Sequence, residues 1–142
     1  MRYYPEKVHS IIDDVILHHM NEQPDLFGNP KEFVTKEMMY SKRRKKELVI
    51  CRQLHQYVAN YIFNEVLNIK LTLGMNGHIF GADHATVHHS LKTITNLYGI
   101  DTQILYMVCN IIDASVRRLK EDDSNQQAHR WYGWLYPQSN IF

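Results

Sequence analysis

A short segment, residues 83–88, gathers hydrogen-bonding side chains of several kinds within one expected helical turn. Its polar and methyl-bearing residues are Asp83, His84, Ala85, Thr86 and His88. A carboxylate can accept a hydrogen bond from the cytosine amino group, an imidazole can donate to a base or a phosphate, and a methyl group can pack on the thymine methyl. A helix that carried these side chains into the major groove of duplex DNA could therefore distinguish base pairs.

A second set of residues could supply the positive charge that such a role requires. The chain of 142 residues carries 16 basic and 15 acidic side chains, a net charge of +1. When one uninterrupted basic run is left out, the rest of the chain has eleven basic and fifteen acidic side chains, a net charge of −4. The run consists of Lys42, Arg43, Arg44, Lys45 and Lys46. The positive charge is thus concentrated, as in proteins that present one face to a polyanion, although a basic run alone is more often a solvated helix start.

The segment 83–88 needs a helix to position it. Asp83 is a favourable N-cap, and apolar residues at helical spacing predict a helix over residues 84–98. Val87 and Leu91 fall on its inward face and should anchor it. Gly99 suits its C-terminal end.

A tight turn and a shorter helix are predicted just before this helix. Gly81 and Ala82 form the expected turn, and residues 72–80 form the expected short helix. Gly74 and Gly77 weaken the helix propensity of that short segment. The short helix, the turn and the capped helix have helix-turn-helix proportions.

The rest of the chain is also helical in pattern. Further helices are predicted over residues 5–20, 31–38, 45–66 and 101–121. The apolar stripe of the first of these comprises Val8, Ile11, Ile12, Val15, Ile16 and His19. No strand-like alternation persists, so the sequence predicts an all-α fold, a multi-helix bundle in a single domain over residues 1–142. A polar stretch and a strongly aromatic tail at 125–142 complete the chain.

Over residues 40–98 the sequence resembles the C-terminal, origin-box-binding domain of the bacterial replication initiator DnaA. Three pieces match in order: the basic run with its flanks at residues 41–47, the pair Arg52-Gln53, and the signature Gly-Ala-Asp-His-Ala-Thr-Val-His-His at residues 81–89. The resemblance implies a Trp-repressor-like helical fold with a helix-turn-helix. It also implies a helix that reads the major groove and a basic-run arginine that enters the neighbouring minor groove.

The resemblance assigns roles residue by residue. Asp83, His84 and Thr86 would read bases, with Ala85 a further candidate. Arg44 would enter the minor groove, with Arg43 as the alternative. Residues that would contact or face phosphates are Lys42, Lys46 and Arg52. The full expected DNA-binding set is Lys42, Arg43, Arg44, Lys45, Lys46, Arg52, Asp83, His84, Ala85, Thr86, His88 and Lys92.

The chain also departs from the family. The family usually has Arg where this chain has Ala82, and Ser or Thr at Ala85. Each lost base contact costs about 1–3 kcal/mol, so the resemblance leaves open whether the chain reads the family's usual origin box. No G-x-x-x-x-G-K-[ST] phosphate loop occurs, so the ATPase module of the initiator is not part of the resemblance.

Other chemistry is not expected. Adjacent histidines at 18–19 and 88–89 point in different directions on a helix, which argues against a metal site. The carboxylate pairs Asp13-Asp14 and Asp122-Asp123 are expected to be surface acidity. Cys51 and Cys109 are expected to be buried thiols. We therefore expect no enzyme, no cofactor and no metal.

Two functions remain after these exclusions. The first is a sequence-specific double-stranded-DNA-binding protein that acts in replication or transcription control. The alternative is an interaction module that keeps the fold and docks a partner, such as a host initiator, through the aromatic tail and the 5–20 helix. With no leader sequence and no apolar run of membrane-spanning length, we expect a reducing, cytoplasmic setting. The sequence leaves the oligomeric state open.

Overall fold

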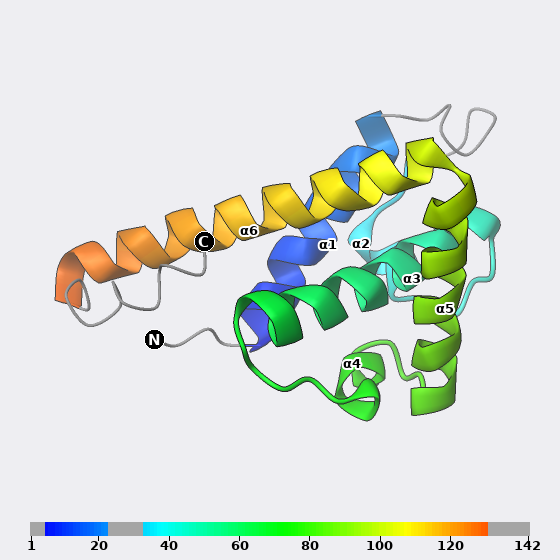
Figure 1. Cartoon of the computed structure of the whole chain (residues 1–142), viewed down its shortest axis with the longest axis horizontal. Helices are drawn as coiled ribbons and strands as arrows, with labels where there is room; N and C mark the ends of the chain where they lie inside the picture. The colour runs from blue at the N-terminus through cyan, green and yellow to red at the C-terminus, as the bar shows by residue number, and fades with distance from the viewer. Residues whose placement is uncertain (1–4, 23–32, 131–142) are drawn as a thin grey trace.

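The computed structural model describes the backbone of residues 5–22 and 33–130, and side chains within these ranges as far as Asp122. The helices are α1 (Pro5–Glu22), α2 (Lys36–Met39), α3 (Lys46–Tyr61), α4 (Leu73–His78), α5 (His84–Ile100) and α6 (Thr102–Arg130) (Figure 1). A π-helical turn, Ile62–Val66, continues α3. The described ranges contain no strand, so the predicted all-α multi-helix bundle is confirmed.

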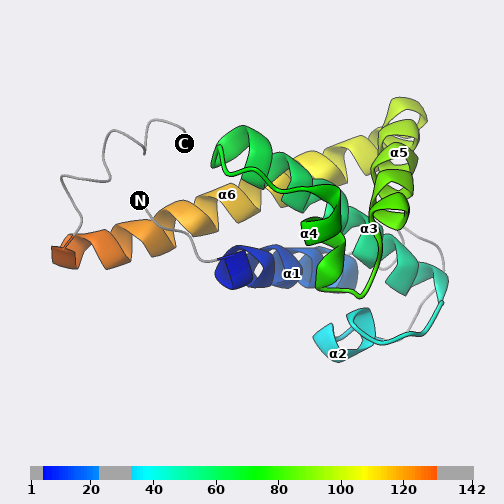
Figure 2. The same cartoon turned by 90° about the horizontal axis from the view of Figure 1, so that it is seen from below.

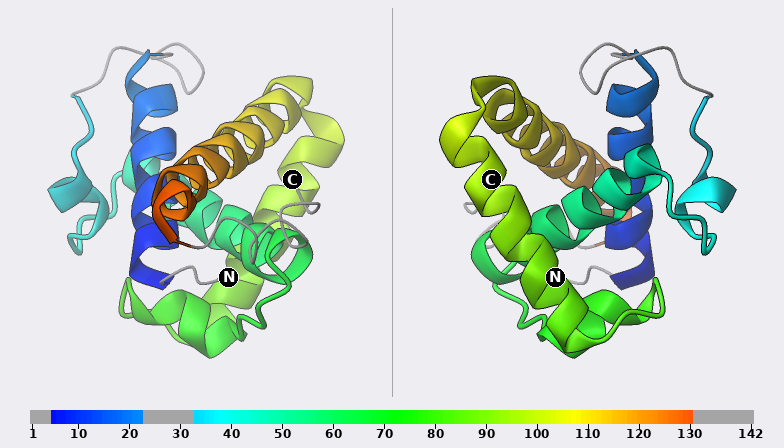
Figure 3. Two further views of the ribbon diagram at one scale, coloured as in Figure 1. Left: turned by 90° about the vertical axis from the view of Figure 1, so that its left-hand side faces the viewer. Right: turned by 90° about the vertical axis from the view of Figure 1, so that its right-hand side faces the viewer.

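Helix α3 lies at the centre of the bundle. It contacts α1, α5, α6, α2 and α4. Helix α6 packs obliquely across α1 and extends well beyond the rest of the bundle, while α5 crosses the opposite end (Figures 1 and 3). The short α4 packs beside the start of α5, and α2 lies on the flank next to α1 and α3 (Figure 2).

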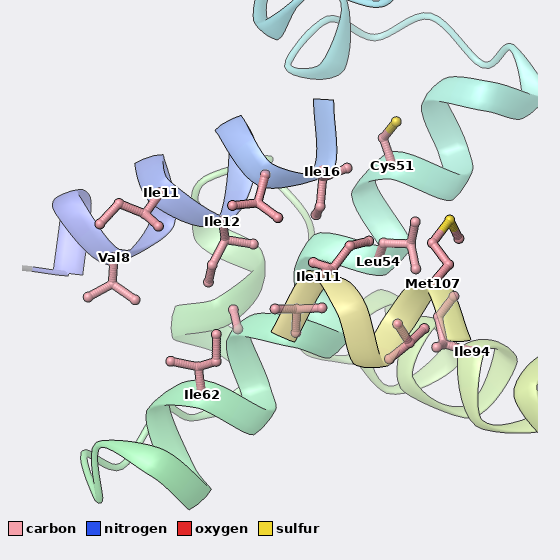
Figure 4. Packing of buried hydrophobic residues seen from close by; sticks show 14 of the residues in the cluster. Val8, Ile11, Ile12, Ile16, Cys51, Leu54, Ile62, Ile94, Met107 and Ile111 are labelled. Atoms are coloured by element: carbon pink, nitrogen blue, oxygen red, sulfur yellow. The ribbon is translucent and has the colours of Figure 1, made fainter. Parts of the chain in front are cut away.

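The core confirms the predicted apolar stripe of α1. Five members of that stripe are buried, and the sixth, His19, is half-buried. They face buried residues of α3 and α6, of which Leu54 and Ile111 have no exposed surface (Figure 4). Burying a side chain of this size contributes about 1.5–3 kcal/mol, which makes this cluster the main source of stability.

Several helix boundaries differ from the predictions. Helix α2 covers Lys36–Met39, because Thr35 caps its first turn by accepting from the Met38 N–H at 3.2 Å; of the predicted range 31–38, residues 31 and 32 lie outside the described residues. Helix α5 passes through Gly99 to Ile100. Only Asp101 separates it from α6, and its side chain accepts from the Gln103 N–H at 2.9 Å.

The last helix is longer than predicted. Helix α6 reaches Arg130 instead of ending near residue 121, because neither Gly nor Pro interrupts the polar stretch that follows and half of its residues have good helix propensity. The backbone of residues 125–130, predicted to belong to the aromatic tail, is therefore helical. The remainder of that tail, residues 131–142, lies outside the described residues.

The π-helical turn gives α3 a distinct ending. The Leu67 N–H bonds to the Ile62 carbonyl at 2.8 Å, five residues back, so one turn is wider than in an α-helix. The Asn64 amide donates to the Asn60 carbonyl at 2.9 Å and accepts from the Leu71 N–H at 3.0 Å. Asn64 thereby fixes the connection that leads to α4.

Two further observations concern the cysteines and the apolar content of the helices. The predicted burial of both cysteines is wrong for Cys109, which is exposed on α6, whereas Cys51 is buried. Burial raises the pKa of the Cys51 thiol to about 12, so it stays protonated. Within the described part of the chain, no helix has the length and apolar content needed to cross a bilayer.

Candidate nucleic-acid interface

The turn between α4 and α5 is tight and fully hydrogen-bonded. Backbone N–H groups of Phe80 and Ala82 donate to the Gly77 carbonyl at 3.0 and 2.9 Å, and the Gly81 N–H donates to the His78 carbonyl at 3.0 Å. Gly81 adopts a φ of +68°, a conformation that side chains disfavour. The turn predicted at Gly81 and Ala82 is therefore confirmed.

Gly77 allows α4 to approach α5 closely. A Cβ at this position would lie 2.5 Å from the Ala82 carbonyl oxygen and 2.8 Å from Cγ2 of Val87. Neither atom belongs to the far end of a flexible side chain, so only glycine fits without a shift of backbone or core. Asn76 next to it donates to the Gln56 carbonyl at 2.9 Å and so ties α4 to α3.

Asp83 caps α5 as predicted. Its carboxylate accepts from the Thr86 N–H at 2.9 Å. This hydrogen bond stabilises the charged form and lowers the pKa of Asp83 below its usual value. The Thr86 side chain also bonds this carboxylate and adds to the lowering of its pKa.

The first turn of α5 presents its polar face outward. All five residues of the segment, Asp83, His84, Ala85, Thr86 and His88, are exposed. Val87 has no exposed surface and Leu91 is half-buried, as predicted. Lys92 is also exposed, about 12 Å along the axis from His84 at 1.5 Å per residue.

The basic run is exposed along its whole length, over the loop before α3 and the first residue of that helix. The guanidinium of Arg52 holds the segment that leads into it. Arg52 donates to the carbonyls of Met39 at 2.7 Å, Arg43 at 2.8 Å, Ser41 at 2.6 Å and Met38 at 3.3 Å. Arg52, expected to face a phosphate, thus spends most of its donors on backbone carbonyls and leaves one N–H for another acceptor.

An aromatic contact joins the basic run to the turn. Tyr40, two residues before the run, stacks on Phe80 with ring centroids 4.6 Å apart. Phe80 immediately precedes Gly81 and also packs edge-on against His55 at 5.1 Å. The two predicted DNA-contacting segments, far apart in sequence, are therefore linked through two neighbouring rings.

Beneath this contact lies a buried relay of Asp13, His55 and His9. Asp13 Oδ1 lies 2.6 Å from His55 Nδ1, and His55 Nε2 lies 2.8 Å from His9 Nδ1. The Tyr40 hydroxyl donates to Asp13 Oδ2 at 2.5 Å. Burial, and then the hydrogen bond to Asp13, raise the pKa of Tyr40 above its usual value. The three relay residues are buried, so they pair with one another in place of water.

Sequence reasoning missed this relay, and the expectation that Asp13 is surface acidity is wrong. Asp13 is 1% exposed, whereas Asp14 is exposed. One signal was available, because His9 and Asp13 lie four residues apart, next to the apolar stripe, and so share the inward side of α1. The partner His55 could not be found from spacing, since it comes from α3.

Among the described residues, no group of three or more His, Cys, Asp or Glu could hold a metal ion.

No protein-family model, curated protein or solved structure matches the chain.

Proposed function

We propose that this chain is a sequence-specific double-stranded-DNA-binding protein that acts in replication or transcription control. The first turn of α5 enters the major groove, and Arg44, or Arg43 in its place, enters the neighbouring minor groove. In this reading α4, the turn and α5 form a helix-turn-helix. The chain then resembles the origin-box-binding domain of DnaA in function as well as in its signature.

The observation that carries the proposal is the division of faces in the first turn of α5. Val87 is sealed against α4 through the close approach at Gly77, while the segment 83–88 turns its other side chains outward. A capped helix end with exposed hydrogen-bonding groups and a buried anchor is what base readout requires. The exposed basic run, linked to the turn through Tyr40 and Phe80, supplies charge beside it.

Selection of bound duplexes from a random pool tests the proposal and yields the preferred site. His84→Ala and Thr86→Ala should each reduce the preference for that site over random duplex by about tenfold or more, because each removes a base contact. His18→Ala, an exposed histidine of α1, is the matched control and should leave the preference unchanged. The proposal fails if no preferred site emerges and both α5 variants bind like the parent.

Phosphate contacts are measured separately, by the dependence of affinity on salt. Lys42→Ala should weaken binding to every duplex alike and reduce the slope of log K against log salt by about 1. Lys120→Ala, an exposed lysine of α6, should not change the slope.

A second candidate is an interaction module that docks another protein. The observation in its favour is the apolar surface at the corner between α5 and α6, where Ile100 is 85% and Tyr106 is 68% exposed. Ala82 and Ala85 also offer no polar group to a base. Capture of a host initiator that survives charge reversal of the basic run but is lost in Ile100→Asp would favour this candidate.

A further inference from the structure

An open pocket of about 580 Å³ lies beside the buried relay. Its volume is within the range of about 300–1,000 Å³ that is typical of small-molecule sites. Apolar side chains of Leu71, Met75 and Ile79 form much of its wall, and polar groups enter from His9, Lys36 and Tyr40. A mainly apolar wall with a few converging polar groups is the usual composition of a ligand site.

The relay determines what His9 offers to this pocket. Asp13 Oδ1 lies 2.6 Å from His55 Nδ1, and the charge of Asp13 is further balanced by the Tyr40 hydroxyl and by Lys36 Nζ at 3.8 Å. With a proton on the Nδ1 that faces this carboxylate, His55 Nε2 can accept from His9 Nδ1–H across the 2.8 Å between the two nitrogens. Burial, and then the neighbouring His55, lower the pKa of His9 to about 4, so its ring is neutral at pH 7. Its Nε2 is left as a hydrogen-bond acceptor.

The charges around the pocket disfavour ionic ligands. The Lys36 ammonium lies between Asp13 and Ser10 Oγ, at 3.8 and 3.2 Å, and would repel a cation. Glu6 on the same wall would repel an anion, and Lys36, already paired with Asp13, does little to attract one. A neutral ligand meets neither penalty.

We propose that this pocket binds a small neutral molecule with a largely apolar body and one hydroxyl or N–H group, which donates to His9 Nε2 while the body packs on Met75, Leu71 and Ile79. The site is separate from the exposed face of α5. It does not depend on the proposed DNA-binding function, and it is tested without DNA.

A matched set of probes isolates the hydrogen bond. We expect 2-naphthol to bind the full chain saturably, with shifts of the Met75 methyl and His9 ring signals in NMR spectra. Its methyl ether, 2-methoxynaphthalene, has the same rings without the donor and should bind about tenfold more weakly. The anion 2-naphthoate should also bind more weakly than 2-naphthol.

Two variants separate the site from the fold. Met75→Trp fills the pocket from an exposed position and should abolish 2-naphthol binding, whereas Ile100→Trp, which adds an indole at the α5–α6 corner, should not. His9→Phe keeps a ring against Phe63 but removes the acceptor, so the phenol and its ether should bind alike. Thermal unfolding of each variant confirms folding.

Any of three results overturns the inference. These are no saturable 2-naphthol binding below about 1 mM, equal or tighter binding of the ether or the anion, and unchanged binding by Met75→Trp. Loss of DNA binding in other experiments would leave all three measurements unaffected.

Discussion

At the scale of single residues, the candidate interface depends on where a side chain is missing as much as on where one is present. Gly77 lets the Ala82 carbonyl and the Val87 side chain come within distances that a Cβ would not tolerate. Without that approach, Val87 could not be fully buried, and the first turn of α5 would not be held with its polar side outward.

Gly77→Ala should therefore destabilise the fold by about 1–3 kcal/mol, because it forces an extra methyl group against backbone and core. Gly74→Ala, in the same helix but with nothing within 4 Å, is the control. It should be neutral or stabilising by up to about 1 kcal/mol through helix propensity. Urea unfolding of both variants gives the comparison, and equal stabilities would contradict the steric argument.

Residues whose role is local could be predicted from the sequence, and residues whose role is a contact across the bundle could not. The Asp83 cap and the Val87 anchor follow from neighbours within one turn, and both are confirmed. Gly77 was expected only to weaken a helix, since its clash partner is set by tertiary packing. Asp13 was expected at the surface for the same reason, because its partner His55 lies on another helix.

At the scale of elements, the loop that carries most of the basic run is held in position by a side chain of α3. Arg52 reaches back from α3 and bonds carbonyls on both sides of the start of the run. A planar guanidinium can bond several carbonyls at once, whereas an ammonium cannot reproduce that fork. The orientation of Arg44 should therefore depend on Arg52.

A double-mutant cycle tests this dependence. On the selected duplex, Arg44→Ala should cost about tenfold in affinity in the parent chain and much less in an Arg52→Lys background, because the released loop no longer aims Arg44. Arg117→Lys, an exposed arginine of α6, is the control background. If Arg52 only faces a phosphate, its charge-preserving change to lysine will leave the Arg44 effect intact.

Element type was predictable, and element ends were less so. The apolar periodicity of α1, α3, α5 and α6 gave their positions, since each must bury one stripe. Gly99 is typical of a helix end, but α5 continues past it to Ile100. Asp101 then caps the end of α5 and also accepts a hydrogen bond from the first turn of α6. No sequence pattern predicts the π-helical turn. The role of Asn64 becomes visible only in the structure, where it accepts a hydrogen bond from the Leu71 N–H.

At the scale of the whole molecule, the buried relay makes stability depend on pH. His9 packs against His55 of α3 and Phe63 of the π-helical turn. It faces Asp13 of its own helix, with Lys36 and Tyr40 nearby. Its pKa falls from 6.5 to about 4, mainly because burial disfavours the charged ring. Between these values the unfolded chain binds a proton that the folded chain does not.

The free energy of unfolding should therefore be highest above pH 6.5 and fall by up to about 3 kcal/mol as the pH drops towards 4. The loss follows from the sign of the shift, since a lowered histidine pKa favours the unfolded state in acid. In His9→Gln this slope should flatten, and His18→Ala, exposed on α1, should keep it. Urea titrations at several pH values measure it, and equal slopes in parent and His9→Gln would refute the assignment.

The π-helical turn that ends α3 makes the number of residues matter at this point of the chain. Each residue of a helix advances the direction of the chain by about 100°. A π-helical turn holds one residue more than an α-helical turn, so deleting one residue from Ile62–Val66 would restore a regular helix with little rotation of the chain that follows, whereas inserting one would rotate it and move Leu67 and Leu71 out of the core. A single-residue insertion here should thus be as damaging as a core substitution, whereas a single-residue deletion should cost much less stability.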